Sequence, residues 1–170
     1  SGASYGGAFS KGQSFEPLQV DAAGENVGLI PSVCFEDTVP RLMRRFVRGG
    51  PQWIVNVTND GWFRESPAAA QHFANAKFRA IELRRPMVRC ANNGVTAAIN
   101  AVGSTAHPET GEAQELRDED GGHFTRGWIL AEVDIPRQPS LSLYMLIGDA
   151  GVAILGSLGL LGGVWIGRRR

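Results

Sequence analysis

The chain contains only two cysteines, Cys34 and Cys90, among its 170 residues. Two cysteines are too few for a domain stapled by disulfides or for a zinc site built from thiolates. The sequence also lacks an excess of charge of either sign, because 17 Lys and Arg residues balance 17 Asp and Glu residues. This balance argues against a protein that binds nucleic acid through bulk positive charge. No metal-binding cluster, phosphate-binding loop or dinucleotide fingerprint occurs, so we expect neither a metal nor another cofactor.

The composition is that of a folded protein. Hydrophobic residues make up 43% of the chain and charged residues 20%, which excludes disordered and fibrous proteins. The length allows one domain with a small appendage. Polar and apolar residues alternate up to about residue 140, whereas the residues that follow are mostly apolar. We therefore expect one domain over residues 1–140 and a separate element after it.

That element is a strongly apolar segment. Residues 150–166 carry no charged side chain, and Trp165 lies near their end, where aromatic residues of a membrane interface are common. Together with the few residues before it, the segment is long enough to cross a bilayer as a helix. We expect a transmembrane helix at residues 144–167, with a buried core helix as the alternative. By the positive-inside rule, the basic tail 168–170 would be cytoplasmic and the domain would lie on the opposite side.

Hydrophobic periodicity and breaker residues divide the domain into strands and helices. Helices are expected at residues 39–48 and 66–85, because a proline opens each and a glycine pair or a proline closes it. Apolar runs predict strands at residues 27–33, 53–57, 87–91, 95–99 and 127–135. Residues 1–12 and 107–122 are expected to be loops. The alternation predicts an α/β fold in which helices cover the strands.

Cys34 stands between the first of these strands and the first helix. A sharp strand-to-helix turn exposes a nucleophile and places backbone N–H groups near it. The positive end of the helix would also favour the thiolate. Cys34 is therefore a candidate nucleophile, although a single cysteine is more often a small buried hydrophobic residue. Cys90 lies inside a predicted strand, and we expect it to be inert.

Four motifs follow one another along the domain. They are Cys34-Phe35-Glu36, NDGWF at residues 59–63, RAIE at residues 79–82 with Arg85-Pro86, and Asn92-x-Gly94-x-Thr96. In this order and spacing they resemble the C-terminal half of a domain of the carbon–nitrogen hydrolase (nitrilase) superfamily. More narrowly, they resemble the apolipoprotein N-acyltransferase family of bacterial membrane enzymes. The resemblance extends over about residues 9–135.

The resemblance implies a fold and a set of roles. Residues 1–140 would be the C-terminal half of a nitrilase-like α-β-β-α sandwich, followed by one C-terminal transmembrane helix. By this resemblance Cys34 is the nucleophile, Glu36 shapes the site, and Phe35, Trp62 and Phe63 contact the substrate. The family's Glu base and Lys lie upstream of the matching segment. We therefore expect the 170 residues to be an inactive fragment that needs the N-terminal part of the same chain.

The implied reaction is fatty-acyl transfer at the bacterial inner membrane. A phospholipid would donate its acyl chain to the cysteine as a thioester, and the N-terminal amine of a diacylglyceryl-cysteine lipoprotein would accept it. The partners are then the phospholipid acyl donor, the apolipoprotein acceptor and membrane lipids, with the catalytic domain on the periplasmic side. Two alternatives stay open. They are a membrane-anchored nitrilase-type amidase that hydrolyses a small amide, and a non-catalytic single-span interaction protein.

Several side chains have a structural and a functional interpretation. His72 could face the site, but a packed or capping histidine is favoured. Glu36 could cap the following helix instead of shaping the site, and the aromatic pair at residues 62–63 could fold back into the core. Glu82 is expected to form a structural ion pair with Arg79 or Arg85.

The helix at residues 39–48 is expected to bury Leu42, Met43 and Phe46 against the sheet. Its other face carries four arginines, Arg41, Arg44, Arg45 and Arg48. The structural interpretation is a solvated face with acidic partners. The functional interpretation is contact with anionic lipid head groups.

Overall fold

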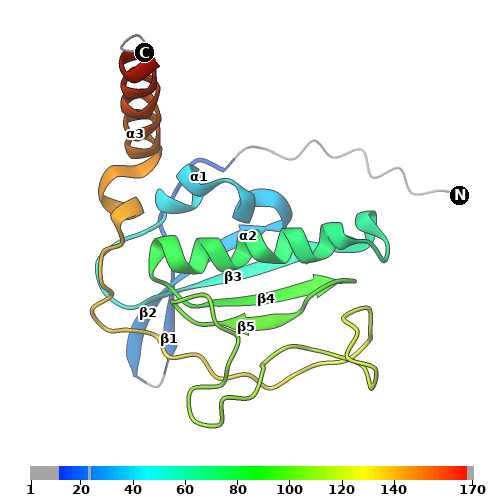
Figure 1. Ribbon diagram of the computed structural model, residues 1–170. Helices are drawn as coiled ribbons and strands as arrows, with labels where there is room; N and C mark the ends of the chain where they lie inside the picture. The colour runs from blue at the N-terminus through cyan, green and yellow to red at the C-terminus, as the bar shows by residue number, and fades with distance from the viewer. Residues whose placement is uncertain (1–11, 23, 168–170) are drawn as a thin grey trace, which may run out of the picture.

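The central layer of the computed structural model, which describes residues 12–22 and 24–167, is a five-stranded sheet (Figure 1). Its strands are β1 (Leu18–Ala22), β2 (Glu25–Val33), β3 (Gln52–Asn59), β4 (Met87–Asn92) and β5 (Ala97–Ile99), in that spatial order. The three middle strands run parallel, and the two edge strands run antiparallel to their neighbours. Parallel neighbours require crossover connections, and helices supply them here. The expected α/β fold is confirmed.

The crossovers carry four helical segments on one face of the sheet (Figure 1). They are η1 (Cys34–Thr38), α1 (Pro40–Arg44), η2 (Asp60–Phe63) and α2 (Pro67–Leu83). Local chemistry sets the ends of α2, because the Ser66 hydroxyl accepts from the Ala68 N–H at 3.4 Å and Pro67 occupies the first helical position. The helix ends where Arg84 turns into the left-handed region, at φ 53° and ψ 42°.

The hydrophobic core lies between this face of the sheet and the helices. Ile30, Ile54, Met87 and Ile99 contribute from the strands, Met43 from α1, and Phe73, Ala76, Ala80 and Leu83 from α2; each is at most 7% exposed. Phe46 packs against the cluster from the turn after α1. The expectation that this face of residues 39–48 is buried is therefore confirmed for Met43 and Phe46. On the other face of the sheet, the paired residues Val33 and Val57 are 58% and 50% exposed.

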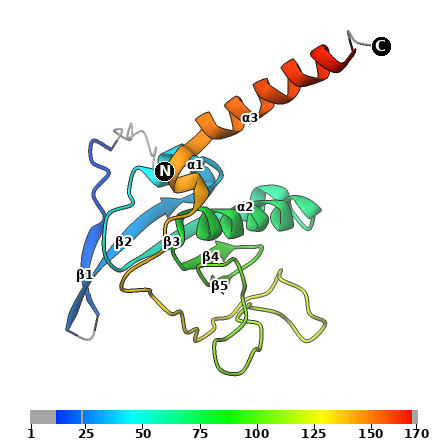
Figure 2. The ribbon, with the colours of Figure 1, turned by 60° about the vertical axis from the view of Figure 1, so that its left-hand side comes forward.

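The predicted strand at residues 127–135 is wrong. In the structure this segment is irregular and runs along the side of the sheet that lacks helices (Figures 1 and 2). The side-chain amide of Gln114 donates to the Glu132 carbonyl at 2.8 Å and accepts from the Glu132 N–H at 2.6 Å. A side chain thus satisfies backbone groups that a ladder would otherwise pair, so the alternating pattern here does not produce a strand.

Several boundaries also differ from the predictions. The first helix is shorter than expected, since α1 ends at Arg44 and continues only as hydrogen-bonded turns to Val47. The expected strand at residues 95–99 begins at Ala97. Sequence patterns gave no sign of β1, because it is a mostly exposed edge strand without an apolar face. The expected loop at residues 1–12 lies almost entirely outside the described residues, and so does the tail 168–170.

The C-terminal helix α3 (Leu143–Gly167) projects away from the sheet (Figure 2) and is broken at Gly148. Its two pieces, Leu143–Gly151 and Ala153–Gly167, meet at 55°. In the described part of the chain no unbroken helix has the length and apolar character to cross a membrane; only this bent pair, taken together, has both. The expectation of one continuous span over residues 144–167 is corrected accordingly. The backbone at Gly148 leaves the helical region, with φ 55°, which favours glycine there; the 55° bend between the two pieces lies further on, between Gly151 and Ala153.

Three of the four arginines on the polar face of residues 39–48 have partners within the chain. Arg44 donates to the Met145 carbonyl at 2.8 Å, which ties α1 to the start of α3. Arg45 lies over the ring of Phe15, 3.4 Å from its centroid, and Arg48 pairs with Glu16 at 2.6 Å. Only Arg48 has the acidic partner that the structural interpretation expects, whereas Arg44 and Arg45 contact a carbonyl and an aromatic ring.

The alternation of burial along β3 generates a stability prediction. Ile54 is fully buried against the helices, whereas Val57 on the opposite face is half exposed. We expect Ile54→Ala to lower the free energy of unfolding by about 2–5 kcal/mol, because it removes buried methyl groups and leaves a cavity. The matched variant Val57→Ala should cost less than about 1 kcal/mol. Denaturant unfolding followed by circular dichroism measures both, and equal costs would contradict the assignment of the two faces.

Candidate active site

Cys34 lies where β2 ends and η1 begins, at the carboxyl edge of the parallel strands. Its backbone φ is 51°, a conformation that L-residues rarely adopt and that costs on the order of 1 kcal/mol or more. Asn56 holds this turn from the neighbouring strand, because its side-chain amide donates to the Cys34 carbonyl at 3.3 Å and to the Ser32 hydroxyl at 2.9 Å. The predicted sharp strand-to-helix turn is therefore present, and it is strained at the cysteine.

Hydrogen-bond donors surround the thiol of Cys34. A hydrogen bond with the Thr58 hydroxyl lowers the pKa of this thiol most, burial opposes the effect, and the backbone N–H groups of Asn59 and Phe35 lower the pKa further. The charge of His72 acts in the same direction. The expected contribution from a helix N-terminus is not the main cause. The cysteine opens a five-residue 3-10 helix, which is too short for a sizeable macrodipole.

Beneath the cysteine turn lies a buried cluster of four charged side chains, Asp37, Asp60, His72 and Arg89, which we call the charge cluster. Each is at most 3% exposed. Asp37 accepts from His72 Nε2 at 2.9 Å and from Arg89 Nη1 at 2.8 Å. Asp60 accepts from His72 Nδ1 at 2.8 Å and from Arg89 Nη2 at 2.9 Å. Two carboxylates thus face two cations, and the cluster connects η1, η2, α2 and β4.

His72 is protonated in this arrangement. Burial alone would lower its pKa, but the hydrogen bonds to Asp37 and Asp60 outweigh burial and raise the pKa to about 9. The pKa of Asp60 is correspondingly low, because His72 and Arg89 overcome the desolvation of its carboxylate. Since both carboxylates are already neutralised by side chains, the cluster is an ion-pair network. Within the described residues no group of His, Cys, Asp and Glu has a metal-binding arrangement.

Sequence reasoning missed this cluster. It favoured a packed or capping role for His72 and assigned no role to Arg89. The available signal was Arg89, a charge inside the otherwise apolar strand sequence MVRCA, which must have a buried partner. The expected ion pair between Glu82 and Arg79 is confirmed at 2.9 Å, whereas Arg85 instead contacts Gln52 and backbone carbonyls.

Two aromatic side chains, Phe35 and Phe63, pack against His72 of the charge cluster. The ring of Phe35 stacks on His72 with centroids 4.7 Å apart, and Phe63 meets both rings edge-on at 5.8 Å. Phe35 is 51% exposed and Trp62 is 80% exposed. Phe63 folds back toward the cluster, while Trp62 does not. Phe35 and Phe63 therefore contact each other and His72, and Phe35 and Trp62 present apolar surface to solvent; contact of the three residues with a substrate stays a prediction.

Glu36 has a local partner. Its carboxylate accepts from the Val33 N–H at 2.8 Å, across the turn that carries Cys34. This bond holds the cysteine turn closed, as a capping carboxylate does. This one contact agrees both with Glu36 as a cap and with Glu36 as a residue that shapes the site. Its role in the reaction stays a prediction.

The Asn-x-Gly-x-Thr motif forms the tight turn that follows β4. Gly94 has φ 100°, and an added Cβ would lie 2.7 Å from a carboxylate oxygen of Asp60. Thr96 closes the turn by accepting from the Ala91 N–H at 3.0 Å. Only glycine therefore allows this loop to lie against the charge cluster.

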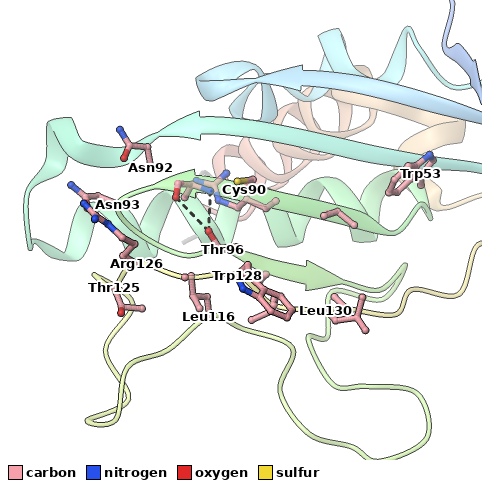
Figure 3. A pocket seen from close by; sticks show the side chains of 17 residues that line it. Trp53, Cys90, Asn92, Asn93, Thr96, Leu116, Thr125, Arg126, Trp128 and Leu130 are labelled. Atoms are coloured by element: carbon pink, nitrogen blue, oxygen red, sulfur yellow. Dashed lines mark hydrogen bonds between the residues drawn. The ribbon is translucent and has the colours of Figure 1, made fainter.

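The largest cavity is separate from Cys34. It has a volume of about 680 Å³ and lies between β4 and the irregular segment at residues 116–131 (Figure 3). Its apolar lining includes Trp53, Leu116, Trp128 and Leu130, and the exposed Cys90 also faces it. The cavity thus occupies the face of the sheet opposite the helices, and no polar cluster like the one around Cys34 converges on it.

Comparisons with known proteins show the family of the chain. The family model of the carbon–nitrogen hydrolases matches residues 5–135. The chain belongs to the carbon–nitrogen hydrolase family. The cysteine turn, the charge cluster and the three aromatic residues all lie inside the matched region.

Three relatives show which members of the carbon–nitrogen hydrolase family this chain is similar to. It is 43% identical over 97 residues to an apolipoprotein N-acyltransferase of Geobacter metallireducens, an alignment that covers 57% of this chain and 18% of the relative. It is 39% identical over 100 residues to the enzyme of that name from Thermotoga maritima, covering 56% and 20%. A third, from Bradyrhizobium diazoefficiens, is 36% identical over 133 residues, covering 78% and 22%. The chain spans about a fifth of the length of these curated relatives.

The raised pKa of His72 predicts a pH dependence of stability. Because the folded-state pKa of about 9 lies above the ordinary 6.5, the stabilisation is complete below about pH 6.5 and is lost as the pH rises through 9. We expect the unfolding free energy of the native chain to exceed that of His72→Gln by on the order of 3 kcal/mol at pH 6, and the difference to shrink by pH 10.

Denaturant titrations of the native chain and of His72→Gln at several pH values measure this difference in unfolding free energy. Subtracting one free energy from the other cancels the contributions of groups that titrate in both proteins. Val57→Ala, at a half-exposed side chain that does not titrate, is the control, and its difference from the native chain should not change with pH. A difference between the native chain and His72→Gln that stays constant from pH 6 to pH 10 would contradict a protonated His72.

Proposed function

We propose that this chain is the nucleophile-bearing C-terminal part of an apolipoprotein N-acyltransferase. The enzyme would transfer a fatty acyl group from a phospholipid to the N-terminal amine of a diacylglyceryl-cysteine lipoprotein. The observation that carries the proposal is the setting of Cys34, which combines a strained backbone, a lowered thiol pKa and an exposed aromatic residue, Phe35, next to it in the chain. The names of the relatives described above support the same activity.

The proposed reaction has two displacement steps. In the first, the Cys34 thiolate attacks the ester carbonyl of the phospholipid; a C–S bond forms, the ester C–O bond breaks, and the lysophospholipid leaves after taking up a proton. In the second, the lipoprotein amine attacks the thioester; a C–N bond forms, the C–S bond breaks, and the amine proton returns to the thiol. The hydrogen bonds around Cys34 favour the thiolate that the first step needs.

The aromatic residues beside Cys34 suit an acyl-chain donor. Phe35, the residue after Cys34, and the exposed Trp62 of η2 offer large apolar surfaces, and an acyl chain that covers such a side chain gains about 1.5–3 kcal/mol. A small amide would bury little of this surface. This contrast, together with the names of the relatives, favours the acyltransferase over an amidase. A purely structural interaction protein would have no need for the strained cysteine turn.

The remaining parts of the enzyme would come from elsewhere in a longer polypeptide. The family resemblance assigns proton transfer to a Glu and oxyanion binding to a Lys, both upstream of the segment matched here. We propose that the face of the sheet that carries Val33, Val57 and the cavity packs against that upstream half to complete an α-β-β-α sandwich. Residues 1–170 alone would then not turn over.

We also propose that α3 anchors the domain in the bacterial inner membrane. Its two pieces together have the length and composition of a span. Arg168–Arg170 follow it directly, which places the C-terminus in the cytoplasm and the catalytic domain in the periplasm.

The first test concerns the nucleophile. The chain is joined in place of the corresponding C-terminal segment of the Geobacter relative, and N-acylation of a lipoprotein is followed by mass spectrometry in a strain depleted of its own enzyme. We expect Cys34→Ala to reduce acylation by roughly 10⁴-fold or more, because no thioester can form. Cys90→Ala is the matched control and should retain activity within about twofold, since its thiol is remote from the reacting atoms. An active Cys34→Ala protein would overturn the proposed function.

The second test concerns orientation. A fluorescent protein that matures only in the cytoplasm and a phosphatase that is active only in the periplasm are fused in turn after Arg170. We expect fluorescence from the first fusion and background phosphatase activity from the second, because the three arginines hold this end inside. Replacing all three with serine is the control and should weaken the asymmetry. High phosphatase activity of the native fusion would refute the orientation.

A further inference from the structure

The side chain of Thr58 connects Cys34 to the charge cluster. Strands β2 and β3 run parallel with Val33 opposite Val57, so the next residues, Cys34 and Thr58, are neighbours at the carboxyl edge of the sheet. Thr58 is 8% exposed. Its hydroxyl donates to Asp60 Oδ1 at 3.0 Å, and the same hydroxyl is close enough to the thiol of Cys34 to lower the pKa of that thiol.

The hydrogen bonds continue inward from Thr58. The same oxygen of Asp60 accepts from His72 Nδ1 at 2.8 Å, and the other ring nitrogen of His72 donates to Asp37 at 2.9 Å. One row of polar atoms therefore leads from the half-buried thiol to the interior of the cluster. The charged groups packed around Cys34 come from four elements: Glu36 and Asp37 of η1, Asp60 of η2, His72 of α2 and Arg89 of β4.

A hydroxyl in this position can serve both protonation states of the thiol. While Cys34 is protonated, its S–H donates to Thr58, and the Thr58 O–H donates to Asp60. When the thiol ionises, the thiolate needs a donor, and rotation about the Thr58 C–O bond turns the same O–H toward sulfur. Asp60 tolerates the loss of that bond, because His72 and Arg89 still donate to it.

We propose that Thr58 is a positioning residue for the nucleophile, and that its hydroxyl switches from Asp60 to the sulfur of Cys34 as the thiolate forms. The inference rests on the proposed role of Cys34 and names a residue that acts through it. The hydrogen bond to sulfur both fixes the direction of the thiolate and favours its formation.

The test follows the reactivity of the thiol rather than acyl transfer. The full chain carrying Cys90→Ser, kept in detergent because of α3, is alkylated with iodoacetamide at a series of pH values, and the rate reports the thiolate fraction of Cys34. We expect Thr58→Val, which has nearly the same shape without the hydroxyl, to alkylate about tenfold more slowly at pH 7, with its pH profile displaced to higher pH.

Two further sets of variants separate the effect of the Thr58 hydroxyl on the thiol from effects of altered packing. Thr58→Ser and Thr58→Ala both lack the methyl group, and we expect only the serine variant to keep the native rate within about threefold. Thr105→Val removes a buried hydroxyl that donates to Glu115, and it should leave the profile unchanged. Circular dichroism confirms that each variant is folded.

The outcomes are distinct from those of the acyltransferase test. A Thr58→Val profile that coincides with the native one, or a serine variant as slow as the alanine variant, would overturn the role of Thr58. Activity of Cys34→Ala in the chimeric enzyme would overturn the proposed function while leaving the measured effect of Thr58 on the thiol intact.

Discussion

The charge cluster of Asp37, Asp60, His72 and Arg89 is the interaction on which the site depends. Four charges are buried there, and each would be very costly without its partners. The two carboxylates come from the 3-10 turns that follow β2 and β3, so the cluster forms only when both turns are in place. The strained backbone of Cys34 is held by Glu36 within the turn and by Asn56 of β3, and the cluster fixes the 3-10 turn that continues from it.

This constraint explains why the chemistry collects at one edge of the sheet. Parallel strands end at the same edge, and the residues that follow them meet there. Cys34 follows β2, Asp60 follows β3, and the turn with Gly94 follows β4. The opposite face of the sheet holds a larger cavity but no comparable set of polar groups. The cavity and the cluster of polar groups therefore lie at different places. Because polar groups activate a nucleophile, the candidate active site is the one at Cys34.

Much of the architecture was predictable from local patterns. The strands β2, β3 and β4 are apolar runs between clear breakers, and α2 begins at Ser66-Pro67 and ends just before Pro86. The prediction failed at residues 127–135, whose alternating pattern is that of a strand. There the side chain of Gln114 satisfies the backbone of Glu132, a non-local contact that no local pattern reveals.

The sequence by itself determined the family, the order of the main elements, and Cys34 with its aromatic neighbours as the candidate site. These follow from motifs and periodicities that are local along the chain. Only the tertiary structure decided that His72 is a buried cation, that Asp37 and Arg89 belong to the site, and that Thr58 contacts the thiol. The reason is physical: each of these contacts joins residues from different elements, and their pKa values depend on burial and charges that exist only after the elements have packed.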